Sequence, residues 1–235
     1  KRQLYGPAPA AAVLKMQLGG RSTRGAGAVA GLVPLASLVF DFTADRLGSN
    51  LVETLSDRTG SWAFRMLRGW LAVSPLRRAL GVPGLLPYRR IFGLLAFLYA
   101  SLHFLTYLLF DLDLDLAPLG EDLMERPFIA VGFATLVLLL PLAITSTRGW
   151  MRRLGRRWQS LHRLAYGAVI RASGHFLWSA KADMLEPRSY VALAGGLLAT
   201  RLIGASGRKA RKYATIRRAP ASVGTMPEPQ ANPGG

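Results

Sequence analysis

Long apolar runs separated by short charged segments are the main pattern of this chain. The clearest runs are Ile91 to Phe110, Pro127 to Ile144 and Leu161 to Trp178, and weaker ones span 25–42, 62–76 and 190–204. A helix needs about 20 apolar residues to cross the ~30 Å hydrocarbon core of a bilayer, and the clear runs approach or reach that length. The pattern predicts an all-α, polytopic membrane protein. We expect helices over about 25–42, 62–76, 91–110, 127–147, 159–178 and 188–204.

Lysine and arginine residues alternate in number between successive polar segments. In chain order the seven segments hold five, two, four, one, five, two and seven of them. Cytoplasmic loops of membrane proteins carry the excess of these residues. The alternation therefore predicts a six-helix bundle with both termini cytoplasmic. The four remaining cations fall inside predicted helices: Arg65, Arg68, Arg163 and Arg171.

The amino-acid composition agrees with a membrane protein and excludes some kinds of site. The 235 residues are 51% hydrophobic yet carry a net charge of +17. So basic a chain often binds nucleic acid, but here the cations alternate with apolar spans, which favours membrane lipids with anionic headgroups as their partner. The absence of cysteine excludes thiolate zinc sites and iron–sulfur clusters. We expect a transmembrane domain over 25–205, between basic cytoplasmic tails at 1–24 and 206–235, the second of them flexible.

Two of the three histidines are predicted to lie at one level of the membrane. His103 follows Arg90 by thirteen residues, roughly 20 Å along a helix that enters from the cytoplasm. His175 lies about five turns into a later helix that enters from the same side, so both are near the outer face. Two such imidazoles on facing helices are a usual way to hold haem b iron, each through Nε2. Hydrogen bonding between the helices and a proton relay are the alternatives.

His162 stands apart from this pair. It precedes His175 by thirteen residues, which places the two about 140° apart around a straight helix. They therefore do not hold one haem between them. His162 is either a ligand to a second cofactor on the cytoplasmic side, such as another haem iron, or an interfacial residue, and the sequence leaves both open.

Three arginines are candidates for binding anionic groups. Arg171 lies one turn before His175, and a lone charge near mid-helix costs about 2.5 to 3.5 kcal/mol, so it needs a partner such as a haem propionate or Asp111. Arg152 and Arg156 belong to "TSTRGWMRRLGRRWQ", whose five cations suit a flavin phosphate or propionates. Sequence variation without a role is the alternative for Arg171, and plain topological charge is the alternative for the other two.

The predicted outer segment "FDLDLDLAPLGEDLMERP" holds six acidic residues and one arginine. It lacks the glycine turn and the spaced ligands of a calcium loop. We therefore expect a solvated loop whose negative charge steers a soluble partner toward the membrane.

Several stretches resemble one family of membrane proteins. "RRIFGLLAFLYASLHFLTYLLFDL", "ERPFIAVGF", "LPLAITSTRGWMRRLGRRWQSLHRLAY" and "HFLWSAKADMLEP" resemble the MsrQ family, also called YedZ, over roughly 30–205. The resemblance implies a ferric-reductase-like six-helix domain that binds haem b and flavin mononucleotide (FMN). It places His103, His162 and His175 on the family's three histidine positions. Arg171 departs from the family pattern, which has an aliphatic residue there.

The resemblance also implies a function. Members of the family are subunits of the bacterial inner membrane that catalyse no reaction themselves. They pass electrons from the quinone pool to a periplasmic, molybdopterin-containing methionine-sulfoxide reductase, which repairs oxidised proteins. The chain has no GxGxxG motif after a strand and no soluble domain large enough for NAD(P)H, so its electrons come from elsewhere. The alternative is a cofactor-free transporter or scaffold whose histidines relay protons or pack helices.

Overall fold

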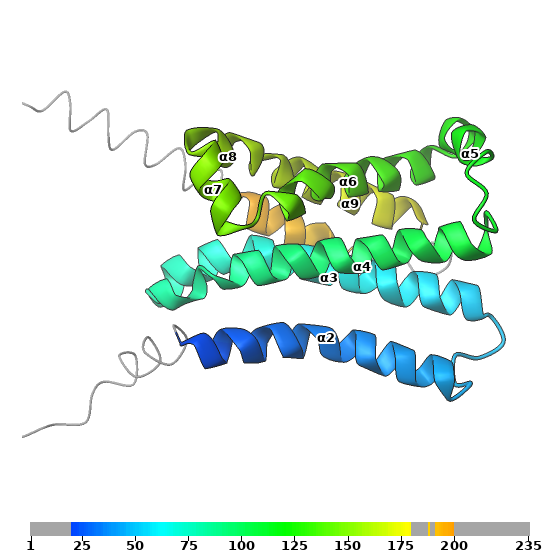
Figure 1. The fold of residues 1–235 in the computed structure, drawn as a ribbon, viewed down its shortest axis with the longest axis horizontal. Coiled ribbons are helices and arrows are strands. Elements are labelled where there is room, and N and C mark those ends of the chain that lie inside the picture. Colours follow the sequence, from blue (N-terminus) through cyan, green and yellow to red (C-terminus); the bar gives the residue numbers. More distant parts are fainter. Residues whose placement is uncertain (1–19, 180–187, 189–190, 200–235) are drawn as a thin grey trace, which may run out of the picture. The chain divides into compact units, whose positions relative to one another are not determined.

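The computed structural model describes residues 20–179, 188 and 191–199, and every regular element in that part of the chain is helical. Residues 1–19 and 206–235 of the expected tails lie outside the described residues, as do 180–187. Helices α7 and α8 lie at one end of the described bundle and α5 lies at the other (Figure 1). The elements are α2 (Arg21–Thr43), α3 (Leu51–Leu80), the 3₁₀ turn η1 (Pro83–Leu85), α4 (Tyr88–Phe110), α5 (Leu119–Glu125), α6 (Pro127–Ile144), α7 (Arg148–Leu154), α8 (Arg156–Leu161) and α9 (Leu164–Ser179).

Three helical stretches in the described residues are long and apolar enough to cross a bilayer: Ser22–Thr43, Pro83–Phe110 and Pro127–Ile144. Large apolar side chains on them point outward, among them Val33 and Phe40, which are 58% and 57% exposed. Apolar side chains facing outward are suited to lipid and unfavourable in water. The chain is an all-helical membrane protein.

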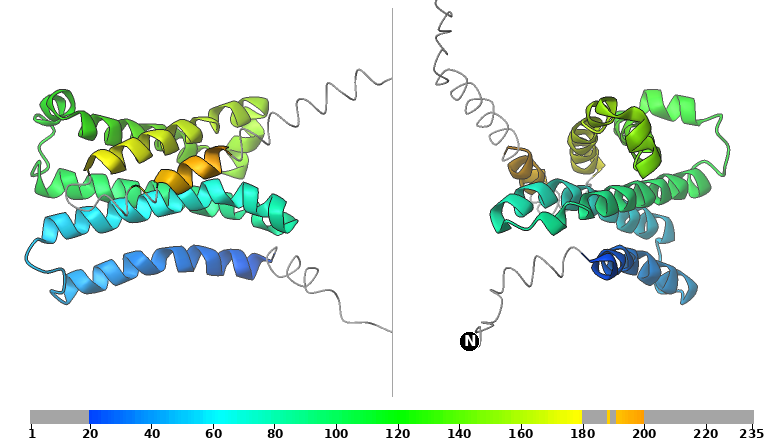
Figure 2. Two further views of the ribbon diagram at one scale, coloured as in Figure 1. Left: turned by 180° about the vertical axis from the view of Figure 1, so that it is seen from behind. Right: turned by 60° about the vertical axis from the view of Figure 1, so that its left-hand side comes forward.

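Two pairs of helices pack most extensively. Helix α3 runs along α4, and α6 runs along α9, with α4 also contacting α6 and α2 (Figures 1 and 2). One compact unit ends at Leu198, and the unit that follows lies almost entirely outside the described residues. The two helix pairs therefore form the frame on which the candidate site is built.

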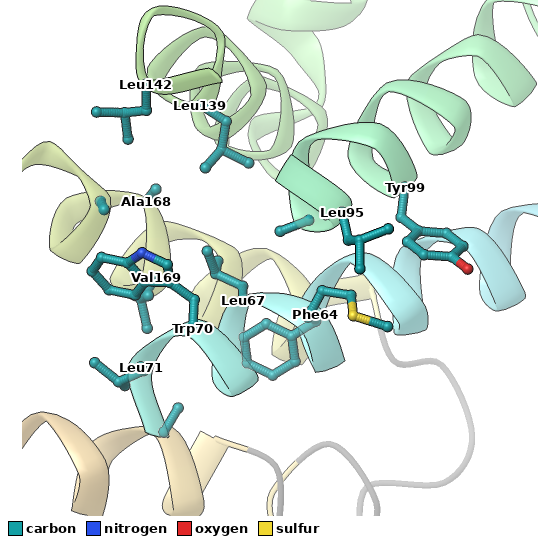
Figure 3. Packing of buried hydrophobic residues seen from close by; sticks show 14 residues of the cluster. Phe64, Leu67, Trp70, Leu71, Leu95, Tyr99, Leu139, Leu142, Ala168 and Val169 are labelled. Carbon is teal, nitrogen blue, oxygen red and sulfur yellow. The ribbon is translucent and has the colours of Figure 1, made fainter. Parts of the chain in front are cut away.

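The core lies where these two pairs meet (Figure 3). Leu71 of α3 and Ala168 and Val169 of α9 are fully buried. The rings of Phe64 and Phe176 stack at 5.0 Å between α3 and α9. Lipid tails are as apolar as these side chains, so close packing, and not exclusion from water, holds such helices together. Most of the cluster comes from Phe64, Leu67, Trp70, Leu71, Leu95, Tyr99, Leu139, Leu142, Ala168 and Val169.

Helix α3 begins eleven residues before the expected start at residue 62. The Asn50 side chain caps it, accepting from the amide of Glu53 at 3.3 Å and donating to the Glu53 carboxylate at 2.6 Å. Arg58 then pairs with Asp41 of α2 at 2.5 Å. These polar first turns are helical but not apolar, so a search for hydrophobic runs does not find them.

The arginines inside α3 are accommodated by aromatic rings. The guanidinium of Arg65 lies 4.9 Å from the ring centre of Trp62, and that of Arg68 lies 5.5 Å from the ring centre of Phe64. A cation over an aromatic face is attracted by the negative face of the ring. Arg68 therefore does not interrupt α3, and the helix continues to Leu80.

The segment before α9 folds as two short helices. Gly155, at φ 48°, separates α7 from α8, and α8 ends at Leu161 with His162 as its C-cap. Helix α9 begins at Leu164, five residues after the expected start at residue 159. His162 thus lies in the turn between two helices.

Candidate functional site

The structure brings His103 and His175 together. Their ring centres are 6.0 Å apart, and the ring planes are inclined at 69°. His103 lies seven residues before the end of α4 at Phe110, and His175 lies four residues before the end of α9 at Ser179. The two imidazoles occupy one level of the bundle, as their positions along the predicted helices indicate.

Each imidazole is anchored by a backbone carbonyl of a neighbouring helix. The Nδ1 atom of His103 lies 3.0 Å from the carbonyl oxygen of Ser56 in α3. The Nδ1 atom of His175 lies 2.7 Å from the carbonyl oxygen of Phe128 in α6. A carbonyl only accepts, so Nδ1 carries the proton in both rings and the lone pair is on Nε2. This is the tautomer and the outer hydrogen bond that metal-ligating histidines usually have.

The pair fits a metal held between two imidazoles. Neither Nε2 atom makes a hydrogen bond with any residue that the structure describes. With imidazole-to-metal bonds of about 2 Å, two rings on opposite sides of one ion have centres roughly 6 Å apart, close to the 6.0 Å found. No group of three or more His, Cys, Asp or Glu among the described residues is placed to bind an ion. The two imidazoles therefore suit an iron whose other ligands belong to a haem.

The surroundings of the pair are apolar. Phe104, next to His103, lies 5.5 Å from Phe133 of α6, ring centre to ring centre. A separate apolar cavity of about 230 Å³, which neither histidine lines, opens between α2, α3 and α4. Apolar walls limit the access of water to a site and thereby influence its redox potential.

His162 belongs to a different cluster. Its ring stacks on Trp158 with centres 4.0 Å apart, and its Nε2 atom lies 3.2 Å from the Thr145 hydroxyl oxygen. That hydroxyl donates its proton to the carbonyl of Pro141 at 2.6 Å, so toward His162 it accepts a hydrogen bond from Nε2–H. The Trp158 indole donates to the carbonyl of Thr145 at 2.9 Å. Among the described residues, no contact occupies Nδ1 of His162, so this ring nitrogen is open to a ligand. The role of His162 in binding haem iron or another cofactor stays a prediction.

An aromatic cluster near His162 was not identified from the sequence. The guanidinium of Arg89 lies 4.5 Å from the ring centre of Trp70, and Trp70 meets Tyr166 edge to face at 5.5 Å. Burial of the His162 ring, and then the nearby Arg89 charge, lower the pKa of His162 below its ordinary value. The sequence signal for this cluster is the "YRR" before Ile91, whose arginines the charge alternation alone explains as topological charge.

The three candidate arginines are all exposed. Arg152 lies in α7, Arg156 begins α8, and Arg171 lies in α9. None of them forms an ion pair with a residue that the structure describes, so Arg171 does not pair with Asp111 here. Binding of cofactor groups by these three arginines stays a prediction.

The acidic segment between α4 and α6 is held partly by side-chain contacts. Tyr107 of α4 donates a short hydrogen bond to the Asp122 carboxylate, and Arg126 pairs with Asp122 at 3.4 Å. A polar cavity of about 550 Å³ lies beside these residues, lined also by Asp111 and Asp113. The solvated character of this loop stays a prediction.

The family match and the similar proteins agree with each other. Residues 30–172 match the family described as ferric reductase like transmembrane component, a stretch that includes His103 and His162 and ends three residues before His175. The chain is 42% identical over 200 residues to the protein-methionine-sulfoxide reductase heme-binding subunit MsrQ of Xanthomonas oryzae pv. oryzae, covering 81% of this chain and 92% of that protein. The subunit of the same name from Brucella ovis is 44% identical over 173 residues, covering 74% of this chain and 78% of that protein.

Proposed function

Because the chain belongs to the MsrQ family of heme-binding subunits, within the ferric-reductase-like transmembrane components, we propose that it is the membrane electron-transfer subunit of a methionine-sulfoxide reductase system. It takes electrons from the quinone pool and delivers them to a periplasmic, molybdopterin-containing reductase that repairs oxidised proteins. The observation that carries this proposal is the His103–His175 pair, with both Nδ1 atoms bound to carbonyls and ring centres 6.0 Å apart.

His103 and His175 would hold haem b in this proposal, each through Nε2. Haem iron, when bound, supplies a one-electron carrier that cycles between the ferrous and ferric states. The two side chains hold that carrier near the outer end of α4 and α9, on the side where a periplasmic protein docks. The carbonyls of Ser56 and Phe128 keep both rings in the ligating tautomer.

The chain spans the inner membrane six times in this proposal, with both termini in the cytoplasm. Helices α2, α3, α4, α6 and α9 supply five spans, and the segment around 188–204 supplies the sixth. The alternation of lysine and arginine between the connecting segments supports this topology. The polar first turns of α3 then lie at the outer surface, and α7 and α8 lie at the cytoplasmic surface.

The cytoplasmic end receives the electrons. His162 offers Nδ1 to a second cofactor, for which we propose FMN, and Arg152 and Arg156 on the adjoining short helices bind its phosphate. Exposed guanidinium groups on α7 and α8 are suited to an anion that approaches from the cytoplasm. Arg171, one turn before His175 in α9, pairs with a haem propionate.

The outer end passes the electrons on. The loop between α4 and α6 carries six acidic residues and one arginine. Such a charge accelerates the encounter with a partner that presents basic groups, and contributes less to final affinity. The periplasmic reductase docks at this loop in our proposal.

The electron route is tested with the purified chain in liposomes under anaerobic conditions. A reduced quinol is added first, and the periplasmic reductase with a methionine-sulfoxide peptide is added second. We expect haem b absorbance of the reduced form to appear with quinol and to disappear with reductase and peptide. Haem that no quinol reduces would overturn the quinone step, and haem that stays reduced after the second addition would overturn the delivery step.

A further inference from the structure

We propose that Gly60 and Gly132 are matched positioning residues that seat the two histidine ligands. This inference rests on the proposed function, since it takes His103 and His175 as axial ligands of one haem. Nothing in the pattern of apolar runs singles out either glycine, and both lie in helix interiors, where glycine costs about 1 kcal/mol relative to alanine. At both positions the structure shows what an added side chain would meet.

Gly132 of α6 lies directly against the His175 ring. A methyl group on Gly132 would lie 2.8 Å from Cε1, 3.0 Å from Nδ1 and 3.1 Å from Nε2 of that ring. The 2.8 Å distance is shorter than real Cβ contacts, and the other two are tighter than nearly all of them, so something must shift. Alanine at this position requires the whole His175 ring to move away from α6.

Gly60 of α3 lies against His103 in the same way. A methyl group there would lie 3.1 Å from both Cε1 and Nδ1 of His103. The overlap is smaller than at Gly132, so the ring has to give by only a few tenths of an ångström. Substitution at Gly60 is therefore the milder of the two perturbations.

One spacing repeats in both helix pairs. The anchoring carbonyl lies 47 residues before its histidine in both cases. Each glycine comes one helical turn after that carbonyl, at Ser56 and Gly60 in α3 and at Phe128 and Gly132 in α6. The first helix of each pair thus presents a carbonyl and a bare backbone, and the second helix places its imidazole on them. The same arrangement of carbonyl and glycine thus occurs twice, once on each side of the proposed haem.

This arrangement fixes two properties of the haem. A proton held between Nδ1 and a carbonyl makes the imidazole a more basic ligand, which favours ferric over ferrous iron and lowers the midpoint potential. Contact with the glycine fixes the ring plane, and the two planes are inclined at 69°. Moving either ring weakens its hydrogen bond and changes this angle.

Gly167 provides a matched control. It lies in α9 like His175, and a methyl group added to it meets nothing within 4 Å. Gly167→Ala therefore tests the effect of replacing a helical glycine in the same bundle without touching either imidazole. Gly174 is also open, but it adjoins His175 and is unsuitable as a control.

The test is a redox titration and an EPR spectrum of the ferric haem for the wild type and for Gly60→Ala, Gly132→Ala and Gly167→Ala. The spectrum of a low-spin ferric haem depends on the angle between its axial imidazole planes. We expect the midpoint potential to rise and the largest g value to shift in both ligand-facing variants, more in Gly132→Ala, and neither to change in Gly167→Ala. If Gly132→Ala does not fold, Gly60→Ala decides the question.

Potentials and g values equal to those of the wild type in the folded ligand-facing variants would overturn the inference while leaving the haem assignment intact. The absence of haem from the wild type would instead contradict the proposed function. Low-spin haem that remains in His103→Ala would contradict it as well. The two failures are therefore distinguishable within one set of samples.

Discussion

The hydroxyl of Tyr99 in α4 donates a hydrogen bond to the carbonyl oxygen of Gly31 in α2 at 2.8 Å. The same hydroxyl accepts from the amide of Leu35 at 3.1 Å. In an uninterrupted helix that amide and that carbonyl bond each other, so Tyr99 joins the backbone of α2 where Pro34 lies inside the helix. Tyr99 is 1% exposed, which makes this a buried link between α2 and the rest of the bundle.

Tyr99→Phe should therefore destabilise the bundle by about 1 to 2 kcal/mol, since interhelical hydrogen bonds in membranes contribute on this scale. Thermal unfolding in detergent, followed by circular dichroism, measures the loss. Tyr88→Phe is the comparison, because the Tyr88 hydroxyl makes one bond, to the Thr23 carbonyl at 3.1 Å. An equal loss of stability in the two variants would show that the two hydrogen bonds of Tyr99 contribute no more than the one of Tyr88.

His162 should make part of the stability dependent on pH. Its pKa is lowered from 6.5 by burial and then by Arg89, so the unfolded chain binds this proton more readily than the folded one. The stabilising contribution of the neutral ring is fully present above pH 6.5 and is lost as the pH falls below that value. His162→Gln should narrow the difference in melting temperature between about pH 7.5 and about pH 5. An unchanged difference would mean that His162 titrates alike in both states.

Arg171 should raise the potential of the proposed haem. A positive charge paired with a haem propionate disfavours the ferric state, so Arg171→Leu should lower the midpoint potential. The control is Arg163→Leu, because Arg163 lies just before the opposite end of α9 and donates to the Ser160 hydroxyl at 2.9 Å. Redox titration of both variants checks the prediction. Equal potentials in Arg171→Leu and wild type would remove Arg171 from the haem site.

The acidic outer loop should influence the rate at which the reductase associates. Asp113 and Glu121 are exposed, and no hydrogen bond or ion pair joins the carboxylate of either to another described residue. The double variant Asp113→Asn, Glu121→Gln should associate several-fold more slowly at low salt and at the wild-type rate at high salt, because salt screens such charges. Stopped-flow measurement of haem oxidation by the reductase gives the rate. Equal rates at low salt would place the docking surface elsewhere.

Part of the site was predictable from the sequence. The histidines are few, and counting residues from the charged helix ends gives their depth, which is why the facing positions of His103 and His175 could be expected. The same count could not show which carbonyl each ring would bind. The packing of α3 on α4 and of α6 on α9 brings the carbonyls of Ser56 and Phe128 to the two imidazoles. Hydropathy does not predict that packing.

Other features of the structure could not be predicted from the sequence, and the structure shows the physical reasons. The first turns of α3 are polar, so only the Asn50–Glu53 cap marked its start. The predicted helix over 159–178 is interrupted at His162, which ends α8 before α9 begins at Leu164, and no glycine or proline marks this break in the sequence. Gly60 and Gly132 carry no signal by themselves, and their common spacing of 43 residues from a histidine gains meaning only once the contacts are seen.

The most direct test of the central claim is a reduced-minus-oxidised visible spectrum of the detergent-purified protein and of three variants, His103→Ala, His175→Ala and His162→Ala. The paired-ligand account predicts a sharp low-spin b-type signal in the wild type and in His162→Ala, and its loss from the other two. A folded, membrane-inserted wild type without pigment, or a signal that persists in His103→Ala or His175→Ala, would contradict it.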